Sequence, residues 1–256
     1  MKFIILGCGS SMGVPRSDGY FGKCNPKNKK NYRSRCSALL KTKDQTILFD
    51  TSPDLRQQLL NNNIKSIDKV FYSHMHADQT HGINDLRVFY IKNKNPIPVY
   101  ADNETKKYLM NTFKYCFVNN NKEYPATLKL NSINNKLYVC DNKKKIIVKP
   151  VKVKHGKVDS ICYIIDKKLA YISDVSDIKK YDYKYFRNLK YLIIDCLWIK
   201  NHPSHLNLES SLKLIEEFKP KQAILTNLHS DLDYNKLLNI LPNNIKPAYD
   251  GMVINI

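Results

Sequence analysis

The chain has 256 residues, 43% of them hydrophobic, and 42 Lys and Arg against 23 Asp and Glu give it a formal net charge of +19. A chain of this length can bury a core without disulfide support, and its 7 cysteines are odd in number, scattered and free of any Cys-x-x-Cys pair. A disulfide-rich secreted scaffold is therefore excluded, and we expect a cytoplasmic protein. Because no apolar run approaches the roughly 20 residues needed to span a bilayer, we expect no membrane partner.

The first part of the chain predicts strands that alternate with helices. Hydrophobic runs predict strands at 2–6, 37–42, 45–50, 69–72 and 97–101, and helical patterns occur at 80–91 and 103–115. Ser52 as the capping residue and Pro53 in the first helical position predict a further helix start. Asn-rich pieces such as residues 119–121 are typical of loops.

The pattern changes after residue 136, where apolar runs follow one another as predicted strands at 137–140, 146–153, 160–165 and 168–173. The last third returns to alternation, with strands at 190–195, 222–226 and 252–256 and helices at 207–218 and from 233. We find no repeat and no long linker. The sequence therefore predicts an α/β protein with two layered sheets, folded as one domain over residues 1–256.

The positive charge consists mainly of lysine, with 36 Lys and 6 Arg. The lysines are spread over predicted turns, which favours solvated surface charge over a continuous nucleic-acid groove. The arginines are more informative, because a guanidinium binds phosphate or carboxylate in a planar, two-point geometry. Arg33, Arg35 and Arg87 lie near the motifs described below and are candidates for binding an anionic substrate, with ordinary surface ion pairs as the alternative.

The most informative stretch runs from His74 to Gly82. His74 and His76 follow a predicted strand two residues apart, and Asp78 comes two residues later. At a strand exit these side chains can turn toward one pocket, and imidazole and carboxylate are ligands for zinc, manganese and iron. The alternative is that the histidines cap a helix. We interpret the stretch as part of a site for one or two divalent ions, Zn or Mn.

This pattern, His-x-His-x-Asp after a strand, resembles the signature of the metallo-β-lactamase superfamily. Later motifs match in order, in Val-Lys-His155-Gly, Tyr-Ile-Ser-Asp174-Val and Leu-Thr-Asn-Leu-His229-Ser-Asp. The resemblance implies a four-layer αββα sandwich. It also implies that the metal ligands are His74, His76, Asp78, His155, Asp174 and His229. Asp50, in Ile-Leu-Phe-Asp-Thr, resembles an aspartate that orients the ligand histidines.

Three segments, at 7–15, 31–37 and 81–87, narrow the resemblance. They are similar to the branch that contains the cyclic-phosphate phosphodiesterase of the carbon–phosphorus lyase pathway and is related to ribonuclease Z. Members of this branch have also been labelled lipoate-biosynthesis proteins, a label that no residue here supports. The resemblance implies two catalytic residues, Asp78 and His205, with His205 as the acid that protonates the leaving oxygen. The alternative for His205 is a capping or surface histidine.

Gln79 departs from the pattern, because the family has a fourth histidine at this position. An amide oxygen is a poorer zinc ligand than imidazole, so the resemblance leaves one metal site intact and weakens the second. Three outcomes are open: a one-metal enzyme, a weak second site, or rescue by His81 two positions later. Gln79, His81 and Asp50 are therefore candidates either as ligands or as residues that support them.

The resemblance implies a metal-dependent hydrolase that cleaves a phosphodiester, a small or cyclic phosphate ester, with a hydroxide activated by the metal. One alternative is a tRNA 3′-end endonuclease of the ribonuclease Z type, although the chain has no insertion long enough for the arm with which that enzyme grips tRNA. Another is a non-catalytic nucleic-acid-binding relative. We expect a small anionic phosphodiester as substrate; a nucleic-acid partner and a homodimer are both compatible with the sequence.

Overall fold

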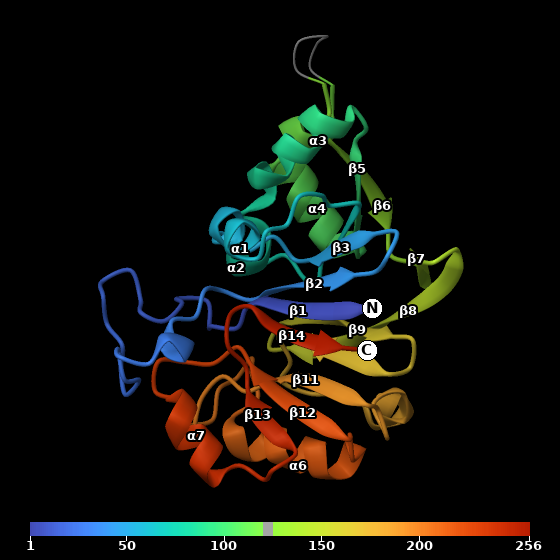
Figure 1. Cartoon of the computed structure of the whole chain (residues 1–256). Helices are drawn as coiled ribbons and strands as arrows, with labels where there is room; N and C mark the ends of the chain where they lie inside the picture. The colour runs from blue at the N-terminus through green and yellow to red at the C-terminus, as the bar shows by residue number, and fades with distance from the viewer. Residues whose placement is uncertain (120–124) are drawn as a thin grey trace.

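The computed structural model describes residues 1–119 and 125–256. Most of the Asn-rich loop predicted at 119–121 lies outside these residues. Within the described part, two seven-stranded sheets face each other, and helices cover both outer faces (Figure 1). The α/β class and the four-layer arrangement predicted from the sequence are confirmed. No helix in the described ranges is long and apolar enough to cross a membrane.

The first sheet carries the N-terminal strands and closes on the last strand of the chain. Its strands in spatial order are β14 (Met252–Asn255), β1 (Lys2–Gly7), β2 (Ser37–Lys41), β3 (Thr46–Phe49), β4 (Lys69–Phe71), β5 (Ile97–Ala101) and β6 (Leu128–Ser132). Because β1 and β14 pair antiparallel, the two termini lie side by side (Figure 1). The strands β3, β4, β5 and β6 run parallel.

The second sheet begins with a meander and ends in parallel strands. Its spatial order is β13 (Ile245–Pro247), β12 (Gln222–Thr226), β11 (Tyr191–Asp195), β10 (Leu169–Ile172), β9 (Val158–Ile165), β8 (Lys144–His155) and β7 (Leu137–Asp141). The run of strands expected after residue 136 is therefore confirmed. The strands β10, β11, β12 and β13 are parallel, so their carboxyl ends meet at one edge.

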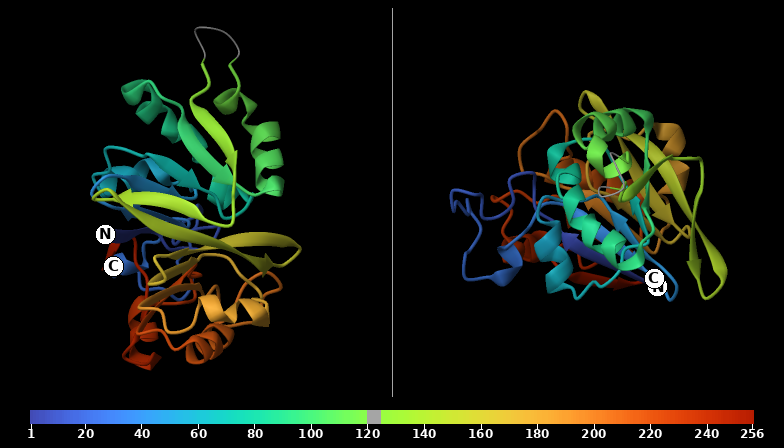
Figure 2. Two further views of the ribbon diagram at one scale, coloured as in Figure 1. Left: turned by 90° about the vertical axis from the view of Figure 1, so that its right-hand side faces the viewer. Right: turned by 90° about the horizontal axis from the view of Figure 1, so that it is seen from above.

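Short helices cover the outer faces of the sandwich. The α-helices are α1 (Leu55–Asn61), α2 (Ala77–Thr80), α3 (Arg87–Asn93), α4 (Asn103–Thr112), α5 (Lys114–Phe117), α6 (Leu208–Phe218) and α7 (Tyr234–Ile240). The 3₁₀ helices are η1 (Lys29–Asn31), η2 (Ile83–Leu86) and η3 (Lys180–Tyr185). The loop between β1 and β2 extends from one end of the sandwich, as Figure 2 shows in its right view.

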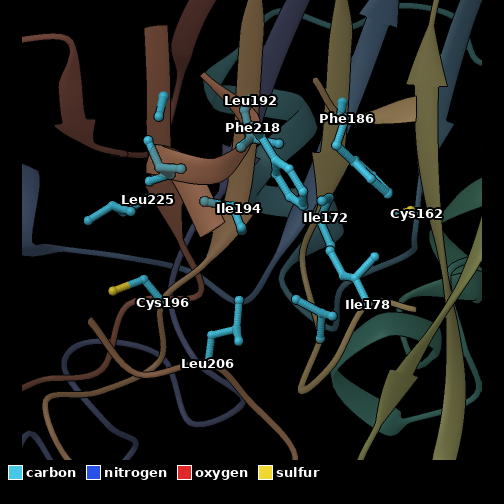
Figure 3. Packing of buried hydrophobic residues seen from close by; sticks show 14 of the residues in the cluster. Cys162, Ile172, Ile178, Phe186, Leu192, Ile194, Cys196, Leu206, Phe218 and Leu225 are labelled. Atoms are coloured by element: carbon cyan, nitrogen blue, oxygen red, sulfur yellow. The ribbon is translucent and has the colours of Figure 1, made fainter. Parts of the chain in front are cut away.

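Three apolar clusters produce the layers. Aromatic rings from both sheets fill the space between them, among them Phe3, Phe49 and Tyr171. A second cluster packs the other face of the first sheet against α1, α3 and α4. A third packs the second sheet against η3, α6 and α7, with Phe186 and Phe218 stacked in its centre (Figure 3). Each sheet therefore buries both faces, which explains the nearly continuous apolar runs of its strands.

The local predictions differ from the structure at several element boundaries. The helix expected at 80–91 is divided into α2, η2 and α3, because the chain must turn at Gly82 to stay close to the loop after β3. The first helix begins at Leu55 rather than Pro53, since Ser52, Pro53 and Asp54 form a turn that the Ser52 carbonyl closes. The strands β6 and β13 were not predicted, because polar residues interrupt the apolar pattern of β6 and β13 has only three residues.

The contact between the sheets gives a first prediction. Phe49 is fully buried and its ring lies within 6 Å of the rings of Phe3, Phe71, Tyr163 and Tyr171. Phe49→Ala should lower the free energy of unfolding by about 3–5 kcal/mol, because it leaves a cavity between the sheets. The exposed control Val88→Ala on α3 should change it by less than about 0.5 kcal/mol. Urea denaturation of both variants measures the difference, and equal stabilities would contradict this view of the core.

Candidate metal centre

Three imidazole rings converge at the edge where the carboxyl ends of the strands meet. His74 and His76 follow β4, and His155 is the last residue of β8. Nδ1 of His76 lies 2.9 Å from Nε2 of His74 and 3.2 Å from Nε2 of His155. Nitrogen ligands about 2.0–2.1 Å from a tetrahedral metal ion lie roughly 3.3 Å apart, so these two distances are close to those of a ligand set, and all three nitrogens lie within 4.8 Å of one another. His76 is exposed, and the site is therefore open to solvent.

In two of the three rings, the nitrogen that faces away from the other histidines is hydrogen-bonded to a protein atom. Nδ1 of His74 pairs with the Ser73 hydroxyl at 3.0 Å, and Nδ1 of His155 donates to the Ser204 carbonyl at 2.7 Å. Such bonds fix the orientation of a ring and direct its other nitrogen to the metal. Burial lowers the pKa of His74 to about 3 and also lowers the pKa of His76 and His155. Neutral imidazole is the form that binds a metal ion.

Asp174 follows β10 and adds a carboxylate to this group. Ligand atoms of His155, Asp174 and His205 lie within 4.8 Å of one another, and so do those of the three histidines. The two groups share His155, so the structure places Asp174 beside the three rings. A set of three imidazoles and one carboxylate suits zinc and manganese.

His205 lies at the edge of this group and contacts a buried carboxylate. Its Nδ1 lies 2.8 Å from Oδ2 of Asp195, the last residue of β11, and its ring centroid lies 4.6 Å from that of His155. Burial alone would lower the pKa of His205, but the charge and hydrogen bond of Asp195 together with the charge of Asp174 raise it to about 9. Asp195 and Asp174 thus favour the protonated imidazole of His205, which is the form required of a general acid.

Asp78 and Asp50 are the other predicted carboxylates. Burial and the charge of Asp174 raise the pKa of Asp78 to about 6. Asp50 is fully buried behind the histidines, where its Oδ1 accepts the backbone N–H of Ser73 at 2.7 Å. It thus holds the loop that presents His74 through the Ser73 backbone, while the Ser73 hydroxyl pairs with the ring. Oδ2 of Asp50 has no partner among the described protein atoms.

The structure places His229 apart from the three converging rings. Its side chain lies against Trp198, with ring centroids 5.1 Å apart, and it belongs to neither group of ligand atoms. Asn227 reaches the site instead, and its Nδ2 lies 3.3 Å from Oδ1 of Asp174. The physical reason is its position: Asn227 follows β12 directly, whereas His229 comes two residues later, after the chain has turned. Asn227 has a φ of 60°, a left-handed conformation that Asn tolerates well.

His81 is not placed to replace the missing fourth histidine. Its Nε2 pairs with the hydroxyl of Tyr108 at 2.8 Å, and its ring is exposed. Gly82, the next residue, explains why the His81 ring faces Tyr108. Gly82 donates to the Thr51 carbonyl at 2.9 Å, and a Cβ at this position would lie 2.0 Å from the Ser52 carbonyl oxygen. Only glycine permits the backbone at residue 82 to come this close to Ser52. The Gly82 that ends the motif is the signal for this contact in the sequence.

The three predicted substrate arginines have different surroundings. Arg33 is buried and donates to Asn31 Oδ1 and to the backbone carbonyl of His229. Arg35 binds both carboxylate oxygens of Asp54, at 2.8 and 2.6 Å. Arg87 begins α3 and is exposed. Arg33 and Arg35 therefore serve loop structure in this conformation, since their guanidinium groups already have protein partners.

Comparisons with known proteins agree with this geometry. The family model described as a beta-lactamase superfamily domain matches residues 45–227. The chain is 31% identical over 256 residues to an octanoyltransferase of Porphyromonas gingivalis, which corresponds to 98% of this chain and 51% of that protein. The chain thus spans about half the length of this curated relative.

Solved structures share the whole arrangement. A diphosphatase from the PhnP family superposes with a TM-score of 0.89 at 29% identity, over 100% of this chain and 97% of that one. Human tRNase Z, short form, superposes with a TM-score of 0.70 at 17% identity, over 100% and 99% of the two chains. The Zn²⁺-bound PqqB of Methylobacterium extorquens gives 0.77 at 15% identity and full coverage of both. The fold, the family model and the position of the histidine motif lead to one conclusion: this chain belongs to the metallo-β-lactamase superfamily.

Proposed function

We propose that the chain is a metal-dependent phosphodiesterase that hydrolyses a small or cyclic phosphodiester. The observation that carries this proposal is geometric: the imidazole of His205, held by Asp195, lies beside a group of three imidazoles and one carboxylate. The ligand group can hold a divalent cation, and a protonated His205 can donate its proton to a leaving oxygen. Hydrolysis of a phosphodiester needs both functions at one phosphorus atom.

His74, His76, His155 and Asp174 would hold the metal ion. Zinc and manganese both fit this donor set, since the rings are neutral and their nitrogens converge. When bound, the ion supplies Lewis acidity to the phosphoryl oxygens and activates water for attack on phosphorus.

His205 is the proposed proton donor, and Asp195 is the residue that positions it. Because Nδ1 of His205 is engaged by Asp195, its Nε2 is the atom that delivers the proton to the leaving oxygen. The P–O bond to that oxygen breaks, a new P–O bond forms to the oxygen of water, and the water gives up a proton to the solvent. An acyclic diester yields an alcohol and a phosphate monoester, and a cyclic diester yields one molecule that carries both groups. Asp195 keeps the imidazole in orientation and favours its charged form.

The comparisons support a phosphorus substrate. The PhnP-family structure that matches nearly the whole chain is named a diphosphatase, and human tRNase Z has the same fold. The Porphyromonas gingivalis relative carries a transferase name, but this chain corresponds to only about half of that protein. The donor set and His205 are suited to hydrolysis, and on that ground we propose a phosphodiester as the substrate.

A screen with controlled metal tests the substrate class. Metal-stripped protein reloaded with Zn²⁺ or Mn²⁺ would be incubated with bis(p-nitrophenyl) phosphate, a 1,2-cyclic ribose phosphate, a dinucleoside diphosphate and a precursor tRNA. We expect turnover of the first two and little cleavage of tRNA. Selective tRNA cleavage would replace the proposal with an endonuclease, and no turnover of any substrate by metal-loaded protein would refute hydrolysis.

A further inference from the structure

Two side-chain amides flank Asp174 on opposite sides. Nε2 of Gln79 lies 3.3 Å from Oδ2 of Asp174 and 3.3 Å from Oδ2 of Asp78. Nδ2 of Asn227 lies 3.3 Å from Oδ1 of Asp174 and 3.2 Å from Oδ1 of Asp195. Since an ionised carboxylate can only accept hydrogen bonds, the NH₂ group of each amide must face it. Both oxygens of Asp174 therefore have an amide donor.

The amide of Gln79 lies between two carboxylates that could otherwise share a cation. Asp78 and Asp174 lie close enough for one NH₂ group to contact both, and paired carboxylates beside a metal-ligand group are typical of two-metal hydrolases. An NH₂ group that donates to both carboxylates cannot also ligate a metal ion. The oxygen of the same amide, Oε1 of Gln79, is buried and has no hydrogen-bond partner among the described residues.

Neither nearby histidine compensates for the amides. His81 pairs with Tyr108, and His229 lies against Trp198, where its Nδ1 is 3.7 Å from a carboxylate oxygen of Asp231. Neither His81 nor His229 therefore brings a ring nitrogen to Asp78 and Asp174, and His205, which lies beside Asp174, is paired with Asp195. The donor set for a second divalent ion is incomplete.

We propose that Gln79 and Asn227 replace a second cation, so that the chain binds one divalent metal ion. The amides join Asp78, Asp174 and Asp195 into one hydrogen-bonded network that keeps these buried carboxylates in place when one ion is bound. This inference rests on the proposed metal site but not on the phosphodiester substrate. A count of bound metal ions therefore tests it separately from activity.

The test is the number of ions per chain. Metal-stripped wild-type protein would be loaded with excess Zn²⁺ and, separately, Mn²⁺, desalted and analysed by mass spectrometry together with protein concentration. We expect one ion per chain for the wild type. The variant Gln79→His/Asn227→His, which supplies two imidazoles, should bind two, and the control His229→Ala should still bind one.

Several results would overturn the proposal. They are two ions per chain in the wild type, a loss of bound metal on His229→Ala, or one ion in a folded Gln79→His/Asn227→His variant. Thermal unfolding with and without metal shows whether each variant is folded. If the double variant does not fold, the wild type and His229→Ala still decide, because a second ion in the wild type or dependence on His229 contradicts the proposal directly.

Discussion

Asp174→Ala should abolish metal-dependent phosphodiester hydrolysis and weaken metal binding together. Asp174 is buried beside the three rings and its two oxygens accept from Gln79 and Asn227. Removing it takes one charged ligand from the centre and leaves two amides without their acceptor. A loss of about 3 kcal/mol in transition-state stabilisation corresponds to about a hundredfold in rate, and we expect at least that decrease in kcat/KM.

The matched control is Asp177→Ala. Asp177 lies three residues later, is exposed, and contributes backbone rather than side-chain hydrogen bonds. It should retain activity and metal affinity within about twofold. Isothermal titration with Zn²⁺ and turnover of bis(p-nitrophenyl) phosphate measure the two properties. Full activity in Asp174→Ala would show that this residue is not part of the metal centre.

His205→Gln should lower kcat strongly for a substrate with an alkyl leaving group and only weakly for one with p-nitrophenolate. An alkoxide must be protonated as it departs, and general acid catalysis contributes about 10²–10⁴-fold in such steps. Nitrophenolate leaves without a proton, so its release does not need the acid. The exposed neighbour His202→Gln, whose ring centroid lies 5.2 Å from that of His205, serves as control. Equal losses for both leaving groups would indicate a structural role.

The same residue sets a pH dependence. With its pKa raised to about 9, His205 is protonated below that value and loses its proton above it. For an alkyl leaving group, kcat should therefore fall as the pH rises through about 9. The His205→Gln variant should lack this fall, because it has no proton to lose. A pH–rate profile of both proteins between pH 6 and 10 shows the difference.

The sequence predicts the fold well because its strands are buried on both faces and bounded by turns. The histidine motif is also readable, since His74, His76 and Asp78 are neighbours along the chain. The strands β6 and β13 are not, because Lys129, Asn131 and Ser132 break the apolar pattern of β6 and β13 has only three residues. The division of the helix at 80–91 follows from a backbone contact between Gly82 and Thr51, which only the folded chain reveals.

Asn227 shows most clearly what the sequence could not provide. In the segment Thr226-Asn227-Leu228-His229 the histidine is the obvious ligand, and residue type alone favours it. The structure places Asn227 beside Asp174 instead, because β12 ends at Thr226 and the side chain that follows lies at the sheet edge. Similarly, Arg33 and Arg35 suit a phosphate by type, but Asn31 and Asp54 already engage them.

The most direct test of the central claim is phosphodiester turnover as a function of bound metal. Metal-stripped protein would be titrated with Zn²⁺ or Mn²⁺, and the hydrolysis of bis(p-nitrophenyl) phosphate would be plotted against ions bound per chain. We predict no turnover without metal, a proportional rise, and a plateau at one ion per chain. Turnover that is equal in stripped and loaded protein, or absent at every loading, would contradict a metal-dependent phosphodiesterase.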